Sequence, residues 1–301
     1  MTGRDAEALL ERVCANRIGE LTYSAMLNRK GGFESDITVQ RLGEREFFIV
    51  TGSAQPVRDL AWLRRHVAEG EDVKIADVTD QWSVISVLGP KSGEILGGIS
   101  LKKGTRAVPA SYVGGPGWEL YVPVGDAAAL YDEITRHGDV RDCGYYALDA
   151  LRIEAGRRAF GAELSLDCTP FEAGLGFAVK LDKPVEFIGR EALRRAPRGE
   201  LAKRLLIFSF PATELFAWGG EPILRDELPV GELTSVGYSG ALGQMVGMGF
   251  VHFHGEREAR FVRRAIRRQL GAEGAPAGLD AQRVERVIAA VPEAKRLARA
   301  P

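Results

Sequence analysis

The sequence is poor in the residues that build disulfide or zinc frameworks. It holds three cysteines and four histidines in 301 residues. Cys14, Cys143 and Cys168 lack C-x-x-C spacing, and the histidines are not paired with them. Disulfide scaffolds and structural zinc sites need such spacings. We therefore expect reduced thiols, no metal site and a cytoplasmic protein.

Long apolar runs, a signal peptide and an excess of one charge are also absent. The sequence has no apolar run of about 18 residues, the length that a membrane span needs. Its first residues, MTGRDAEALLERV, are charged and lack the apolar centre of a signal peptide. The formal net charge is −1, so no global basic field favours nucleic acid. These absences predict a soluble protein with neither membrane nor nucleic-acid partners.

The motifs of several enzyme classes are missing too. No G-x-G-x-x-G follows an opening strand, and no Walker A loop occurs. The late GMGF at 247–250 is typical of packing between strands. No G-x-S-x-G and no plausible Cys/His nucleophile pair occur either. We therefore expect neither a flavin nor a nicotinamide site in this chain.

What is present is an alternation of helical and strand periodicity. Asp5 is a candidate N-cap for the first helix and Ser53 for the second. Strand, helix, strand, strand, helix, strand between 46 and 125 is the order of a ferredoxin-like split βαβ unit. The expected helices are 5–14, 53–67, 90–99, 126–138, 144–156 and 189–196; the expected strands in this part are 20–28, 36–42, 46–52, 73–79, 82–89, 118–124 and 177–181.

The sequence pattern changes twice in the last third of the chain. Short strands with turns between 201 and 255 are typical of a small barrel or sandwich. From 256 to 301 the sequence is rich in Ala and Arg and favours helices. That tail is interpreted as a solvated amphipathic helix pair, with a basic surface for an acidic partner as the alternative.

Two acids and one ring are candidate functional residues. Gly31 and Gly32 precede Asp36, which suits either a plain turn or a loop that aims Asp36 into a pocket. Glu154 lies near a helix end, where the helix dipole disfavours a carboxylate, so it is either solvated or has a specific partner. Trp218, in FAWGGEP, lines either a cleft or the core.

Several stretches, in this order, carry a resemblance to a known family: MLNRKGGFESDITV, GSAQPVRDLAWLRRH, WSVISVLGPKSGEIL, ALDALRIEAG, TPFEAGLGFAVKLDKPVEFIGREAL and GEPILRDELPVGELTSVGYSGALGQMVGMGFV. The chain resembles the aminomethyltransferase (glycine cleavage T-protein) family from residue 3 to residue 253. It is most similar to the branch fused behind a flavin domain in dimethylglycine and sarcosine dehydrogenases.

The resemblance implies an α+β fold, a three-part ring around a channel that binds tetrahydrofolate. It implies a folate-binding domain at 1–45 and 140–200, a ferredoxin-like domain at 46–139 and a C-terminal β-barrel at 201–255. It also implies transfer of a one-carbon unit to tetrahydrofolate, from an aminomethyl group or from the iminium made by oxidation of an N-methyl amine.

The resemblance further implies roles for single residues. Asp36 matches the family's key acid beside the reacting folate nitrogens, and Glu154 matches the acid on the pterin edge. Lys183 matches a basic residue that meets the folate in some members. The remaining implied cofactor-binding positions are Tyr23, Met26, Trp218 and Tyr238.

Both ends depart from the family pattern. By the resemblance, we expect the chain to begin within the folate domain and the tail from 256 to stand where the family has its last barrel strands. Two further readings therefore stand beside a working transferase. One is a folate module that needs a separate flavoprotein domain or subunit. The other is an inactive, truncated family member.

Overall fold

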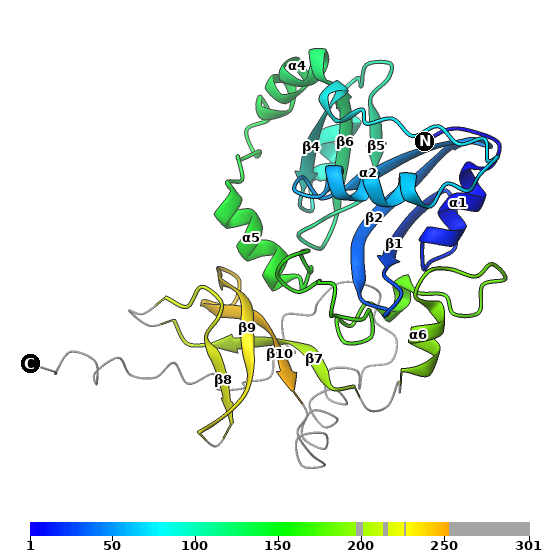
Figure 1. Cartoon of the computed structure of the whole chain (residues 1–301). Helices are drawn as coiled ribbons and strands as arrows, with labels where there is room; N and C mark the ends of the chain where they lie inside the picture. The colour runs from blue at the N-terminus through cyan, green and yellow to red at the C-terminus, as the bar shows by residue number, and fades with distance from the viewer. Residues whose placement is uncertain (197–200, 213–215, 226, 253–301) are drawn as a thin grey trace, which may run out of the picture. The chain divides into compact units, whose positions relative to one another are not determined.

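The structure is a computed structural model that describes residues 1–196, 201–212, 216–225 and 227–252. The helical tail expected at 256–301 lies outside these residues. The chain divides into two compact units, whose helices and strands are labelled in Figure 1. Unit 1 joins Met1–Asp77, Arg158–Leu205 and the stretch from Phe250; unit 2 joins Val78–Arg157 and Leu206–Gly249.

Unit 1 is built on an antiparallel three-stranded sheet in the order β1-β2-β3. Its strands are β1 (Leu21–Leu27), β2 (Phe33–Gly43) and β3 (Glu46–Thr51). Helix α1 (Ala6–Val13) precedes the sheet, and α2 (Pro56–Arg65) follows it. Because successive strand residues point to opposite faces, each strand divides its side chains between two environments.

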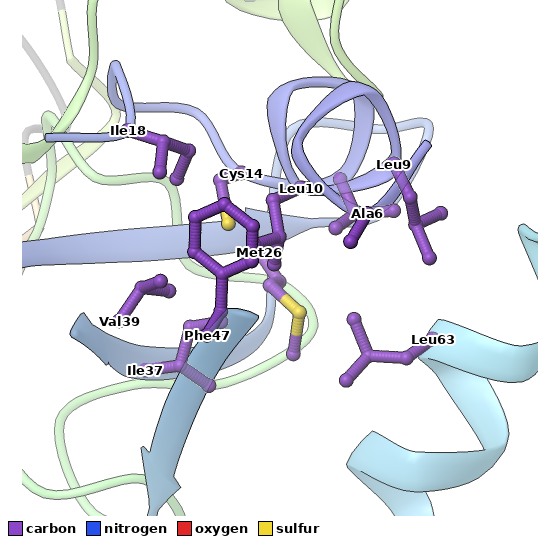
Figure 2. Close-up of a cluster of buried hydrophobic side chains, with 11 residues drawn as sticks. Ala6, Leu9, Leu10, Cys14, Ile18, Met26, Ile37, Val39, Phe47 and Leu63 are labelled. Carbon is purple, nitrogen blue, oxygen red and sulfur yellow. The ribbon is translucent and has the colours of Figure 1, made fainter. Parts of the chain in front are cut away.

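One face of this sheet is apolar and packs against both helices. Figure 2 shows side chains of α1, the three strands and α2 converging around the ring of Phe47. The paired positions Val39 and Ile49 belong to this face, as do Arg41 and Phe47. Burial of such a cluster is the main stabilising term of the unit. Its buried members are Ala6, Leu9, Leu10, Val13, Cys14, Ile18, Met26, Ile37, Val39, Phe47 and Leu63.

A buried lysine joins two segments of unit 1 that are far apart in sequence. The Lys183 ammonium donates to the carbonyl oxygens of Glu11 at 2.6 Å, Cys14 at 2.9 Å and Asn16 at 3.1 Å. It also forms an ion pair with the Glu11 carboxylate at 2.7 Å. The last carbonyls of a helix lack partners within it, and a cation there also opposes the helix dipole. Lys183 therefore caps the end of α1.

The glycine turn before β2 is tightly packed. Gly31 has φ +87°, and a Cβ at Gly32 would stand 1.8 Å from the carbonyl oxygen of Leu166. The Asn28 side chain accepts from the Gly32 amide at 3.2 Å and donates to the Leu166 oxygen at 2.9 Å. The two glycines are thus required for close contact with another segment of unit 1, and not for hinge motion.

Unit 2 contains a second antiparallel sheet, in the order β4-β6-β5, with helices on one face. Val87, Leu120 and Val122 of this sheet pack with Leu130 and Ile134 of α4. The elements are β4 (Trp82–Leu88), α3 (Ser92–Gly97), β5 (Arg106–Val108), β6 (Gly117–Pro123), α4 (Val124–Thr135) and α5 (Tyr145–Glu154).

A four-stranded sheet in the order β7-β10-β9-β8 covers the region expected to form a barrel. Its strands are β7 (Lys203–Phe210), β8 (Pro222–Arg225), β9 (Leu228–Ser239) and β10 (Gln244–His252). Across the described ranges, every helix is too short or too polar to cross a membrane.

The structure corrects three expected strands. The strand at 46–51 pairs with β2 and so belongs to the first sheet, outside the split βαβ order. Residues 73–79 form only a single bridge, between Lys74 and Thr2, because no longer partner strand lies beside them. Residues 177–181 begin with the last two residues of the 3-10 helix η2 (Gly176–Ala178). Beyond that helix, the Lys180 amide donates to the Ala15 carbonyl oxygen.

Helix starts differ as well. Helix α2 begins at Pro56 after Gln55, so Ser53 does not cap it. Proline suits this first position because it has no amide hydrogen to leave unpaired. Asp5 precedes α1 as expected, although its carboxylate makes no capping hydrogen bond there and instead accepts from Arg4 and from the Asp72 amide.

Lys183→Met should lower the free energy of unfolding by about 3 kcal/mol, since it leaves the Glu11 carboxylate and three carbonyls without their partner. Urea denaturation would measure the loss. Lys180→Met, at an exposed neighbouring position, is the matched control and should be near neutral. Equal effects of the two changes would contradict the capping role.

Gly32→Ala should cost about 2 kcal/mol, because the added methyl collides with backbone at Leu166. Gly43→Ala is the comparison, since a Cβ there meets no atom within 4 Å. Thermal melts of both variants would test this. A flexible hinge would instead tolerate both substitutions equally.

Candidate functional site

Asp36 lies on the face of the first sheet that is turned away from the apolar cluster. It is paired with Ala25, and the next pair along this face is Tyr23 with Thr38. Asp36 and Tyr23 are therefore diagonal neighbours on one face, within reach of long side chains. The Tyr23 hydroxyl donates to Asp36 Oδ2 at 3.1 Å. Two predicted site residues are thus in contact.

An exposed aromatic ring lies beside this pair. Phe177, in η2, stacks on Tyr23 with 6.1 Å between ring centroids and 28° between planes. Its side chain is 60% exposed, which is unusual for a phenylalanine that already has an aromatic partner. Sequence reasoning missed Phe177, because FAVKL was interpreted as a strand. The group combines a carboxyl, a phenol and an open ring face, features that suit a planar, polar ligand.

Burial sets the electrostatics of Asp36. It raises the pKa of the carboxyl above its ordinary value of 3.8, because the charged form loses hydration. The hydrogen bond from Tyr23 opposes this shift, and the charge of Asp59 adds to it. A carboxyl with a raised pKa can hold or release a proton closer to neutral pH than an exposed one.

Two other predicted residues lie away from Asp36. Met26 is fully buried in the apolar cluster on the opposite face of the sheet, opposite Ser35 in the strand register. The Lys183 ammonium is fully buried against α1 and contacts four oxygens. An ammonium group that already donates to these oxygens has no hydrogen left to donate to an anionic ligand.

Glu154 is the last residue of α5 in unit 2 and is partly buried. Its carboxylate has no hydrogen bond or ion pair with any residue in the described part of the chain. Nearby, Arg152 fixes the helix by donating to Ser235 of β9 at 2.8 Å and to Asp149 at 2.7 Å. Glu154 therefore stands at the end of a firmly held helix with its own acceptors unused.

Trp218 and Tyr238 belong to the same unit and are 67% and 48% exposed. The Trp218 ring contacts Phe216 at 4.9 Å and Tyr146 of α5 at 6.5 Å between centroids. Tyr238 follows Gly237, where a Cβ would stand 2.9 Å from Ala150 of α5. The Trp218 ring thus lies beside α5, whereas Tyr238 comes next to a residue that faces α5 and by strand alternation points the other way. Tyr146 was missed because the Tyr145–Tyr146 pair was interpreted only as helix.

The thiols have no catalytic features. Burial raises the pKa of Cys14 and of Cys168 to about 12, so neither is a thiolate at neutral pH. Cys143 is exposed. Within the described ranges, no group of three or more histidine, cysteine or acidic side chains is placed to hold a metal ion.

Family models match most of the chain. The GCVT N-terminal domain matches residues 1–107 and 101–183. The glycine cleavage T-protein C-terminal barrel domain matches residues 203–276. The two matched regions follow each other in the order that the sequence motifs predict.

Relatives of different lengths are similar to this chain and support the same family. The chain is 34% identical over 275 residues to human mitochondrial dimethylglycine dehydrogenase. It is 32% identical over 282 residues to the mouse mitochondrial pyruvate dehydrogenase phosphatase regulatory subunit. In both cases 83% of this chain covers 32% of the relative, so the chain spans about a third of their length. It is 30% identical to the aminomethyltransferase of Bacillus cytotoxicus and covers 75% of that protein.

The fold agrees with a solved structure as well. The crystal structure of the glycine cleavage system aminomethyltransferase T from Bartonella henselae superposes with a TM-score of 0.75 at 24% identity. The match covers 83% of this chain and 74% of that one. This likeness shows an α+β fold of the kind found in that protein and confirms the predicted fold class. The chain belongs to the aminomethyltransferase (glycine cleavage T-protein) family, as its motifs predicted.

Asp36→Asn should stabilise the fold at neutral pH. The folded carboxyl has a pKa above 3.8, so the unfolded chain ionises first and stability falls as pH rises through the interval between the two pKa values. Asparagine cannot ionise, and its side-chain oxygen can still accept from Tyr23. Urea denaturation from pH 3 to pH 8 should show the variant's advantage growing with pH.

Glu44→Gln is the matched control for that experiment, because Glu44 is exposed in the turn between β2 and β3. Its substitution should change stability little at any pH. A pH-independent difference between Asp36→Asn and the wild-type protein would mean that burial does not perturb Asp36.

Proposed function

We propose that this chain is a tetrahydrofolate-dependent protein that transfers a one-carbon unit, from an aminomethyl group or an N-methyl amine-derived iminium, to tetrahydrofolate. The observation that carries the proposal is the Asp36 group in a member of this family. Asp36 is partly buried, accepts from Tyr23, and stands beside the stacked ring of Phe177. Tetrahydrofolate would supply the nitrogen that receives the one-carbon unit.

Asp36 is the proposed catalytic acid. Carbon transfer between nitrogens passes through positively charged species, and a fixed carboxylate in a partly dehydrated site stabilises such charge strongly. Its raised pKa also allows it to take up a proton released at the nitrogen. Tyr23 holds Oδ2 in place, and the exposed face of Phe177 is available for stacking on a planar ring.

Glu154, Trp218 and Tyr238 are proposed folate contacts in unit 2. A pterin edge is rich in donors, which suits a carboxylate with unused acceptors. The exposed Trp218 and Tyr238 rings supply flat apolar surface. Lys183 and Met26 are not included, because both are fully engaged in the interior of unit 1.

Calorimetric titration with tetrahydrofolate tests the proposal. The wild-type chain should bind saturably, and Glu154→Ala should weaken binding at least about tenfold through the loss of charged hydrogen bonds. Asp36→Asn should bind within a few-fold of wild type but lower the transfer rate about a hundredfold or more. Glu44→Gln is the control. No saturable binding by the wild-type chain would rule out a working folate site.

A second candidate is a folate module that works with a separate flavoprotein. It is favoured by the fact that the chain covers only a third of dimethylglycine dehydrogenase. Such a module would bind tetrahydrofolate alone but turn over only when a flavin dehydrogenase supplies the oxidised amine. A non-catalytic family member is the third reading. A melting temperature that tetrahydrofolate does not raise would favour that one.

A further inference from the structure

A buried carboxyl on α2 lies directly under the strand that carries Asp36. Asp59 is 3% exposed, and its Oδ2 accepts from the Ser35 hydroxyl at 2.7 Å. The Thr51 hydroxyl, at the end of β3, donates to the same oxygen. Gln55, the residue before α2, donates to the Ser35 oxygen at 2.6 Å. A continuous hydrogen-bond chain therefore links α2, β2 and β3 at the residue before Asp36.

The backbone ladder is weakest at this point of β2. The register with β1 shifts between Met26, paired with Ser35, and Leu27, paired with Phe33, so Glu34 is an extra bulged residue. On the other side, pairing with β3 starts only at Ile37. A bulge re-aims the side chains next to it and leaves the local backbone less constrained. The position of Asp36 therefore needs another support.

Helix α2 supplies that support through side chains. Arg58 approaches the bulged Glu34, with 3.5 Å between Nε and Oε1, and Asp59 holds the adjacent Ser35. Ser35 and Asp36 are neighbours whose side chains point to opposite faces of β2. Holding the Ser35 side chain from the α2 side therefore fixes the backbone from which the Asp36 side chain extends on the other face. The second Asp59 oxygen, Oδ1, is buried and has no hydrogen-bond partner among the residues that the structure describes. Such a group is costly for stability alone, which indicates a positional role.

We propose that Asp59 is a positioning residue for Asp36: it anchors Ser35 across the bulge of β2 and thereby sets where the Asp36 carboxyl meets Tyr23 and the ligand. This inference rests on the proposed function for the role of Asp36, but the anchoring itself does not. Asp59 touches neither the ligand face nor Tyr23, so it acts only through β2 and through its charge.

Three variants separate the effect of the hydrogen bond between Asp59 and Ser35 from the effect of the Asp59 charge. Asp59→Asn keeps an oxygen acceptor for Ser35 and Thr51 but removes the charge. Asp59→Ala removes both, and Ser35→Ala removes the hydrogen bond while the carboxyl stays. Glu44→Gln, at an exposed carboxylate of the same unit, is the control. Tyr23 of β1 and Arg58 of α2 are the other titratable or charged groups acting on this pair of carboxyls.

The first readout needs no ligand: NMR titration of the Asp36 carboxyl and amide exchange at residues 35–37. Asp59→Asn should lower the pKa of Asp36, because a neighbouring negative charge is gone, and should leave exchange unchanged. Ser35→Ala and Asp59→Ala should each speed amide exchange at these residues. Wild-type exchange at residues 35–37 in Ser35→Ala or in Asp59→Ala would overturn the proposal, because the anchor would then not hold this part of β2.

The second readout is affinity for tetrahydrofolate. Asp59→Ala and Ser35→Ala should bind about tenfold more weakly, the scale of one lost hydrogen bond, and Asp59→Asn should recover most of that loss. Wild-type affinity in all three variants would count against positioning. If the wild-type chain itself does not bind, the proposed function fails, and the ligand-free measurements alone decide the role of Asp59.

Discussion

The buried ammonium of Lys183 is the contact on which the organisation of unit 1 depends. It fills a place that only a cation with several hydrogens can fill, among carbonyls at the end of α1 and the Glu11 carboxylate. Without it, these oxygens would be buried and unpaired, which is expensive in a protein interior. With it, the segment around 183 is fixed against the first helix. Phe177, six residues earlier in the chain, stacks on Tyr23 of β1.

The first sheet then divides stability and chemistry between its two faces. One face supplies the apolar cluster shown in Figure 2, and the other carries Asp36 and Tyr23. Strand alternation makes this possible within single strands, since Ile37 is buried in the core while its neighbour Asp36 points to the opposite face. Holding a carboxyl in a partly dehydrated place costs stability, which is common at functional sites. The bulge at Glu34 and the hydrogen bond that holds Ser35 lie next to this carboxyl, and they belong to the same balance between stability and the position of Asp36.

Family membership and the chain's own geometry limit the function in different ways. The family includes relatives named as an aminomethyltransferase, a dehydrogenase and a regulatory subunit. Membership alone therefore does not choose among transfer, a part in an oxidative enzyme and a role without turnover. In this chain Asp36 has both a hydrogen-bond partner and an open aromatic neighbour, the two features on which the proposed transfer rests. Lys183, which the resemblance matches to a folate contact, is engaged with four oxygens of unit 1.

Periodicity and motif order determined much of this protein. Alternation in β1 and β2 and the helical spacing of α1, α2, α4 and α5 were readable, because side-chain period follows directly from backbone geometry. Several stretches in order, among them the long TPFEAGLGFAVKLDK motif, identified the family. Only the tertiary structure decided which strands pair, that 177–181 is not a strand, and that Gly32 is a contact point. It also decided that Lys183 is a cap and that Asp59 lies under Asp36. The strand pairing, the Gly32 contact and the Lys183 cap depend on backbone groups, which every residue possesses and which therefore leave no mark in the sequence. The Asp59 contact depends on Ser35 and Thr51, which only the fold brings beside it.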